Sequence, residues 1–293
     1  MEAYRTPDEH FHGLPGYDFA PNYVEQDGLR LHYLDEGSGT PVLLLHGEPT
    51  WSYLYRTLIP ELTPSARAIA PDYFGFGRSD KPLRREDYTY DFHVGSIVRL
   101  VEELDLLELT VVVQDWGGPI GLRLAVERPD RIGRLVIMNT GIGGGRPPSE
   151  EWLRFRDWMA RLGTDIVPGR LIEISAVQPI VEEVVEAYSA PWPVPESKQG
   201  ILAFPGLVPI SPDHPDLPAH IAVREELSNW DRPTLVLFSD SDPIFSPRAA
   251  ERIAAHIPGA GEAEIVAGAG HFLQEDQGEV IGRSISEFVA STS

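Results

Sequence analysis

Short apolar runs that end in polar or glycine-rich turns recur along the chain between about residues 41 and 266. Continuous apolar runs of this length are typical of strands buried on both faces of a parallel sheet. Two earlier segments, near Tyr23 and at Arg30–Leu34, predict an antiparallel hairpin that opens the sheet. The expected buried strands are Pro41–Leu45, Ala68–Ala70, Leu109–Val113, Arg134–Met138, Thr234–Phe238 and Glu264–Val266.

Helix-like stretches alternate with these runs, because their apolar residues recur near the 3.6-residue helical period. The expected helices are Ser52–Glu61, Phe92–Leu104, Pro119–Glu127 and Pro247–His256. Strands and helices that alternate at this spacing predict an α/β protein with a mostly parallel, doubly wound sheet.

The alternation breaks between Gly141 and Ala219, where the chain becomes rich in Pro, Trp and helix formers. The stretch begins with Gly141–Gly145, a plausible hinge. It predicts an inserted helical cap at residues 143–218, over a core formed by residues 1–142 and 219–293. The expected cap helices are Glu150–Leu162, Arg170–Ala176, Pro179–Ala187 and Lys198–Phe204.

Composition narrows the class of protein and its partners. A 42% apolar and 24% charged chain of 293 residues is ordinary for a globular protein with a sizeable core. The formal charge of −21 argues against nucleic acid and anionic membranes as partners, because phosphate contacts need clustered Lys and Arg. The absence of cysteine excludes disulfides and thiolate chemistry. With no signal-peptide pattern and no long apolar stretch, we expect a cytoplasmic protein.

The most informative motif is Val111–Gly121, in which a buried strand runs into a Gln-Asp-Trp-Gly-Gly turn and then a helix. The residue at the tip of such an elbow is held in strained geometry above a helix N-terminus. Here the tip is Asp115, where most hydrolases have serine. A carboxylate is already anionic and can displace a leaving group from saturated carbon. The alternative is that Asp115 merely caps the following helix.

Two further segments supply the groups that such a nucleophile needs. His271 follows the last strand, and histidine is the side chain best suited to activate water near neutral pH. Asp242, with Asp240 as its rival, follows an earlier strand and could fix the histidine tautomer. The order nucleophile, acid, histidine is that of the α/β-hydrolase fold. Either aspartate could instead stabilise a turn.

The loop His46–Trp51 follows the first predicted parallel strand. In this fold one backbone donor to the oxyanion comes from that loop and the other from the residue after the nucleophile. The sequence therefore predicts an oxyanion hole built from the backbone N–H groups of Glu48 and Trp116.

These segments together resemble the haloalkane dehalogenases, in particular the branch that contains the dichloroethane-degrading enzyme. The likeness spans almost the whole chain and is loosest between Gly141 and Glu186. The resemblance implies Asp115 as nucleophile, His271 as base, Asp242 as acid and Trp116 as a halide-binding group. The segments that carry it are His46–Pro60, Asp72–Pro82, Asp87–His93, Gln114–Gly121 and Gly270–Glu275.

The same family branch takes a second halide-binding indole from the start of its cap. Here Trp158 is the candidate, with Trp152 and Phe155 as alternatives, because the cap alignment does not fix the register. Phe155 at that position would supply no hydrogen-bond donor. All three aromatics could equally be packing residues of one helix. The expected pocket walls, for which core packing is the alternative, are Phe92, Pro119, Trp192, Phe204, Pro205, Ile244 and Phe245.

The expected reaction is hydrolysis of a carbon–halogen bond in a small neutral halogenated alkane, with halide as a product and without cofactor or metal. Epoxide hydrolysis is the nearest rival, because it uses the same Asp-His-Asp set with a cap tyrosine, for which Tyr188 is a candidate by residue type. A catalytically silent binding protein is a third possibility. We expect a monomer or a homodimer.

Overall fold

In the computed structural model, which describes residues 1–144 and 148–292, eight strands form one twisted sheet in the order β10-β9-β8-β7-β4-β5-β3-β2. Among the described strands of this sheet, β3 alone runs opposite to the others. Tyr23 of β2 pairs with His32 of β3, which confirms the predicted hairpin. The fold class expected from the sequence is therefore confirmed. The strands are β2 Asn22–Gln26, β3 Leu29–Gly37, β4 Thr40–Leu45, β5 Ala66–Pro71, β7 Leu109–Gln114, β8 Ile132–Met138, β9 Thr234–Ser239 and β10 Glu264–Val266.

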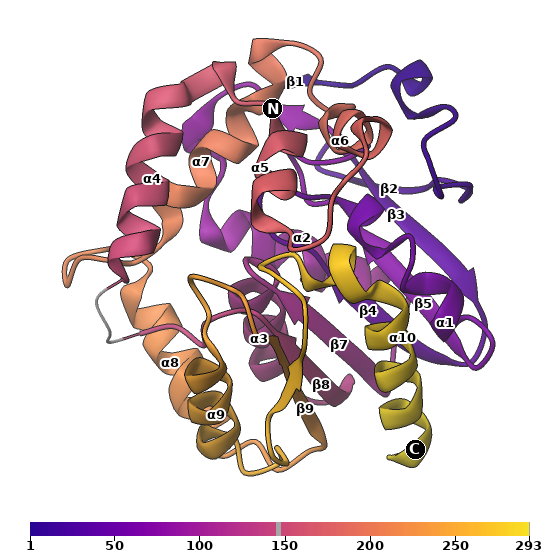
Figure 1. The fold of residues 1–293 in the computed structure, drawn as a ribbon, viewed down its shortest axis with the longest axis vertical. Helices are drawn as coiled ribbons and strands as arrows, with labels where there is room; N and C mark the ends of the chain where they lie inside the picture. Colours follow the sequence, from indigo (N-terminus) through magenta and orange to yellow (C-terminus); the bar gives the residue numbers. More distant parts are fainter. Residues whose placement is uncertain (145–147, 293) are drawn as a thin grey trace.

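Helices cover the sheet, so that every residue of β7 and of β9 is buried. Helix α1 packs on α10, while α2 packs on α3, which in turn contacts α8 (Figure 1). The continuous apolar runs of the central strands are explained by this cover on both faces. The helices packed around the sheet are α1 Ile59–Leu62, α2 Tyr90–Glu103, α3 Gly117–Glu127, α9 Pro247–His256 and α10 Leu273–Ser291, and α8 Leu217–Leu227 spans the predicted boundary between cap and core.

Four further helices lie together on one side of the sheet, at the top of Figure 1, as the predicted cap requires. They are α4 Glu150–Leu162, α5 Pro168–Ser175, α6 Glu182–Ser189 and α7 Gln199–Leu207. Of the expected hinge, Gly143 and Gly144 have φ angles of 71° and 70°, whereas Gly145 lies outside the described residues. The boundary proposed at residue 219 falls inside α8, and the division into core and cap stays a prediction.

Two segments differ from the sequence expectation. The helix expected at Ser52–Glu61 is split into a 3-10 turn, η2 (Ser52–Tyr55), and the short α1, whose first turn accommodates Pro60. The C-terminal α10 was not predicted, although its buried residues Ile281, Ile285 and Val289 recur every four positions. The remaining elements are β1 Ala3–Tyr4 paired with β6 Lys81–Pro82, and the 3-10 turns η1 Asp8–Phe11, η3 Arg85–Asp87, η4 Gly163–Asp165 and η5 Pro195–Lys198.

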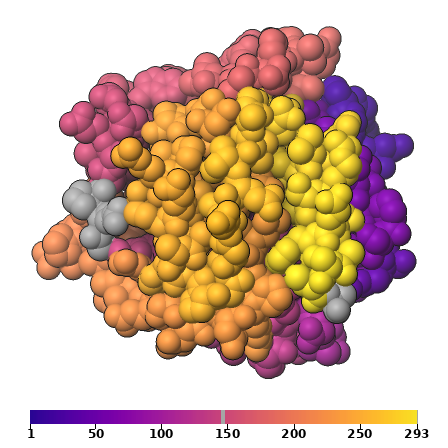
Figure 2. Space-filling view, turned by 60° about the horizontal axis from the view of Figure 1, so that its bottom comes forward, coloured from indigo at the N-terminus to yellow at the C-terminus, as the bar shows by residue number. Residues whose placement is uncertain are grey.

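The C-terminal third of the chain, orange to yellow in Figure 2, covers most of the face seen there, with the indigo N-terminal segment at its edge. Within the described residues, no helix is long and apolar enough to cross a membrane.

Candidate active site

Asp115 stands at a sharp elbow between β7 and α3, with a φ angle of 49°. The left-handed conformation is uncommon for a residue with a side chain and marks stored strain. Small neighbours make room for it: a Cβ atom on Gly117 would lie 2.1 Å from the carbonyl oxygen of Leu45, and one on Gly118 would lie 1.9 Å from Oγ1 of Thr140. The Thr140 hydroxyl donates to the Asp115 carbonyl at 2.6 Å, which fixes the elbow from the next strand.

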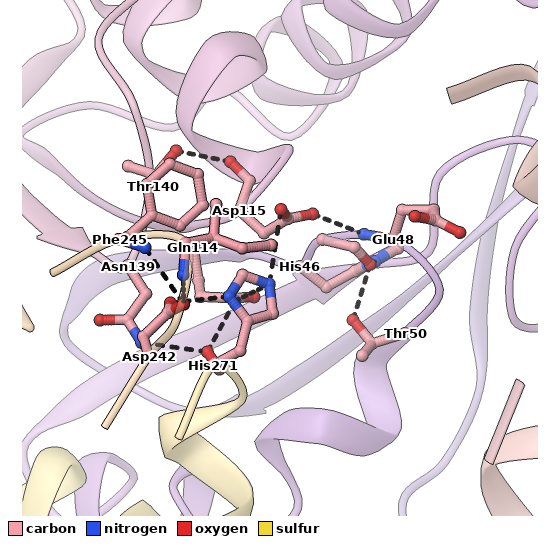
Figure 3. Close-up of polar contacts among 12 residues, drawn as sticks. His46, Glu48, Thr50, Gln114, Asp115, Asn139, Thr140, Asp242, Phe245 and His271 are labelled. Carbon is pink, nitrogen blue, oxygen red and sulfur yellow. Dashed lines mark hydrogen bonds and ion pairs between the residues drawn. The ribbon is translucent and has the colours of Figure 1, made fainter. Parts of the chain in front are cut away.

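The two carboxylate oxygens of Asp115 face different groups (Figure 3). Oδ1 accepts a hydrogen bond from the backbone N–H of Glu48 at 2.9 Å, and Oδ2 lies 3.5 Å from Nε2 of His271. The backbone of Gly47 also lies close, since a Cβ there would be 2.3 Å from Cβ of Asp115. The side chain remains 19% exposed. Oδ1 is thus held by a backbone donor, and Oδ2 faces the imidazole ring.

His271 lies between Asp115 and Asp242. Its Nδ1 is 2.8 Å from Oδ2 of Asp242, and the Asp242 carboxylate also accepts from the N–H groups of Ile244 and Phe245. Asp240, the rival acid, is bonded elsewhere: it accepts from the backbone of residues 268 and 269 and from its neighbouring serine. The geometry thus places Asp242, not Asp240, against the histidine.

The charges around His271 decide its protonation. Burial lowers its pKa, but the negative charge of Asp242, the hydrogen bonds with Asp115 and Asp242, and the charge of Asp115 together raise the pKa of His271 to about 10. Burial likewise opposes the charge on Asp242, yet His271 and two backbone donors keep the pKa of Asp242 below its ordinary value. With Asp115 ionised, His271 is therefore the imidazolium ion between two carboxylates.

Two amide side chains support the His271 loop and were missed by sequence reasoning. Gln114 Nε2 donates to the carbonyl of His271 at 3.1 Å. Asn139 Nδ2 donates to the carbonyls of Gly270 and His271, while its oxygen accepts from the N–H of Ser239. Each amide residue lies at the end of a buried strand, and this position could have been recognised in the sequence.

The loop after β4 is fixed by its own buried groups. Nδ1 of His46 donates to the carbonyl of Gly47, because Nε2 accepts from the N–H of Tyr73. Burial lowers the pKa of His46 and so favours the neutral ring. Burial and the charge of Asp115 raise the pKa of Glu48 well above its ordinary value, which disfavours a second negative charge beside Asp115.

The aromatic residues expected around the site divide into two groups. Phe204 of α7 packs edge-on against the buried ring of Trp116, with 4.9 Å between ring centroids, and Phe245 stacks on His271 at 5.9 Å. Phe92 instead stacks on Phe74, and the indole N–H of Trp192 donates to the carbonyl of residue 75.

The other expected wall residues have contacts of their own. The carbonyl of Pro119 accepts from the hydroxyl of Tyr90. Ile244 lies beside Asp242, to which its N–H donates. Pro205 lines a hollow of about 280 Å³ between α4 and α7, together with Arg156 and Met159.

The three candidate cap aromatics lie on α4. Phe155 and Trp158 are half-buried against the core, with 6.4 Å between ring centroids. Trp152 lies under the guanidinium group of Arg156. Which of them faces Trp116 stays a prediction.

Tyr188, the candidate proton donor for epoxide opening, is engaged elsewhere. Its buried hydroxyl donates to Glu275 at 2.6 Å, and Arg56 contacts the same hydroxyl at 3.4 Å. This phenol therefore serves the contact between the cap and the core.

An elbow that carries an aspartate, followed along the chain by an acid and a histidine that meet it at the ends of parallel strands, defines an α/β-hydrolase with a carboxylate at the nucleophile position. Residues 40–166 match the family model described as the alpha/beta hydrolase fold.

Comparison with known proteins narrows the class. The chain is 45% identical to the haloalkane dehalogenase of Psychrobacter cryohalolentis over 99% of this chain and 98% of that protein. It is 47% identical to haloalkane dehalogenase 1 of Mycobacterium tuberculosis over 98% of each. The structure of the haloalkane dehalogenase DpaA from Paraglaciecola agarilytica superimposes with a TM-score of 0.90 at 33% identity, covering 100% of this chain and 98% of that one. The chain belongs to the haloalkane dehalogenase family, which confirms the family and enzyme class expected from its sequence.

Proposed function

We propose that the protein hydrolyses the carbon–halogen bond of small neutral haloalkanes through an ester on Asp115. The observation that carries this is the different surroundings of the two carboxylate oxygens: Oδ1 accepts from the N–H of Glu48, and Oδ2 lies 3.5 Å from Nε2 of His271. Oδ2 attacks the carbon that bears the halogen, and the bonding electron pair leaves with the halide. The indole N–H of Trp116 and one donor from α4 hold that ion, because a donor-only group cannot compete as a nucleophile.

The second step returns the enzyme to its starting state. His271, oriented by Asp242, takes a proton from water, and the hydroxide attacks the carbonyl carbon of the ester. The N–H groups of Glu48 and Trp116 stabilise the oxyanion that forms on Oδ1. Collapse of this intermediate breaks the bond between the carbonyl carbon and the alkoxy oxygen. The alkoxide takes the proton of the new carboxyl group and leaves as the alcohol, which regenerates the Asp115 carboxylate. His271 keeps the proton taken from water, because it had already released its own proton to solvent when alkylation removed the charge of Asp115.

The direct test compares brominated alkanes with a terminal epoxide in a lightly buffered solution that contains a pH indicator. We expect acidification and bromide release with the alkanes alone. Asp115→Ala should abolish both signals, and bromide release that survives this substitution would contradict the assignment. Epoxide hydrolysis releases no acid, so the diol is measured by gas chromatography, and turnover of the epoxide alone would favour the rival reaction.

The halide site is tested by tryptophan fluorescence. We expect bromide to quench the emission with saturation, and Trp116→Phe to weaken that saturable component. Replacing Trp158 by Phe identifies the cap donor, with Trp152→Phe as the control on the same helix. Quenching that rises linearly with bromide in the unmodified protein would contradict the proposed halide site.

The expected monomer or homodimer and the expected cytoplasmic location are also proposals. One of the related structures is described as tetrameric, so analytical ultracentrifugation of the purified protein is the appropriate measurement. Cell fractionation with an antibody to the protein would test the compartment.

A further inference from the structure

The loop that carries His271 is bonded directly to the cap. The backbone N–H of His271 donates to the carbonyl of Ser175, the last residue of α5, at 3.1 Å. The two chains lie so close that a Cβ atom on Gly270 would be 2.2 Å from the same carbonyl oxygen. The backbone that positions the imidazole of His271 is therefore held by Ser175, about a hundred residues earlier in the chain.

One side chain spans the same junction from the other side. The carboxylate of Asp276 accepts hydrogen bonds from the N–H groups of Val177 and Gln178 in the cap, the shortest at 2.7 Å. It also accepts from the N–H of Gly270 at 2.8 Å. Asp276 ends the first turn of α10, because the next residue, Gln277, leaves the helical conformation. We name this set of contacts the Asp276 bridge.

We infer that Asp276 is a positioning residue for His271, which acts by fastening the cap turn at residues 175–178 to the histidine loop. This inference rests on the proposed role of His271 as the base. Asp276 itself contacts three backbone donors, so it acts through the loop rather than on the substrate. A carboxylate suits this place, since both of its oxygens accept and neither donates.

A second, separate contact holds the cap when the bridge is removed. Glu275 pairs with both terminal nitrogens of Arg56, at 2.7 and 2.6 Å, and accepts from the hydroxyl of Tyr188 on α6. Loss of Asp276 alone therefore leaves the cap attached and releases mainly the histidine loop. Because His271 serves only the hydrolysis of the ester, that step should slow while alkylation of Asp115 proceeds.

The test is rapid-quench mass spectrometry of the full chain with 1-bromobutane, which follows formation and decay of the butyl ester. The variants are Asp276→Asn, which turns an N–H donor toward the bridge, and Asp276→Ser, which keeps an acceptor but shortens the reach. Glu279→Gln is the matched control, because this α10 carboxylate is 70% exposed and pairs with Arg283 on the same helix.

We expect both Asp276 variants to hydrolyse the ester roughly tenfold to a hundredfold more slowly, as a displaced catalytic group does, and to accumulate it. Alkylation should stay within about twofold of the unmodified protein, and Glu279→Gln should behave as unmodified protein does. Ester decay at the original rate in both Asp276 variants, or an equal fall in both steps, would overturn the inference. Absence of ester and of bromide release in the unmodified protein would instead contradict the proposed function, and so the two failures are distinguishable.

Discussion

The base role of His271 depends on a change of charge at its neighbour. In the free protein the pKa of His271 is raised to about 10, which makes it a poor base near neutral pH. Esterification of Asp115 removes one of the negative charges that cause this. At 3.5 Å, unit charges interact by roughly 5 kcal/mol at an effective dielectric constant of about 20. The corresponding loss of proton affinity is about three-thousandfold, which returns the pKa of His271 toward the ordinary range for histidine.

The substitution Asp115→Asn reproduces this loss of charge in a stable protein. We expect NMR titration of the imidazole resonances to give a lower pKa for His271 in this variant. The fall should correspond to most of the loss of proton affinity calculated above. Asp242→Asn should also lower the pKa of His271, because the first of its favourable contacts is removed. An unchanged His271 titration in Asp115→Asn would refute the idea that alkylation itself prepares the base.

Three further predictions concern the intermediate, the elbow and the acid stability. His271→Phe should leave a stable alkyl-enzyme that is visible by mass after exposure to substrate; unmodified protein at the end point would count against a two-step reaction. Gly118→Ala should lower the free energy of unfolding by about 1–3 kcal/mol and abolish turnover, because the new Cβ would meet Thr140. Gly95→Ala, whose Cβ would meet no atom within 4 Å, should not destabilise the protein. Chemical denaturation of both variants tests this. Despite burial, His32 keeps the pKa of Asp72 below its ordinary value of 3.8. The ionised Asp72 therefore contributes stability above that pH, and this contribution is lost as the pH falls below it. Acid unfolding followed by circular dichroism from pH 5 to 2 should be less steep in Asp72→Asn than in the unmodified protein.

Much of the site could be predicted because its signals are local. The strand–turn–helix pattern around Asp115 requires small residues at fixed positions, and the structure shows which atoms they would otherwise strike. His271 and Asp242 follow strands whose ends meet at one edge of a parallel sheet. The topology of the sheet therefore brings together Asp115, Asp242 and His271, which lie far apart in the sequence.

The cap was harder to predict, because its helices are inferred from an amphipathic pattern, and that pattern does not fix the rotation of a helix about its own axis. Phe155 and Trp158 are one helical turn apart and share a face, so the sequence alone cannot decide which ring faces the core more closely. The structure places both against the core and Trp152 under Arg156. A choice between Phe155 and Trp158 as the group near the halide needs the substitutions described above.

The Asp276 bridge shows a kind of contact that sequence patterns do not reveal. Asp276 has the character of an acidic residue in the first turn of a helix, where favourable interaction with the helix dipole already explains it. Its partners are backbone N–H groups that are 98 and 99 residues away, and any non-proline residue supplies such a donor. No residue type or spacing at Val177 or Gln178 therefore marks them as partners. Side chains that carry chemistry leave a residue-type signal, whereas the side chains that hold the backbone beneath them become visible only in the folded chain.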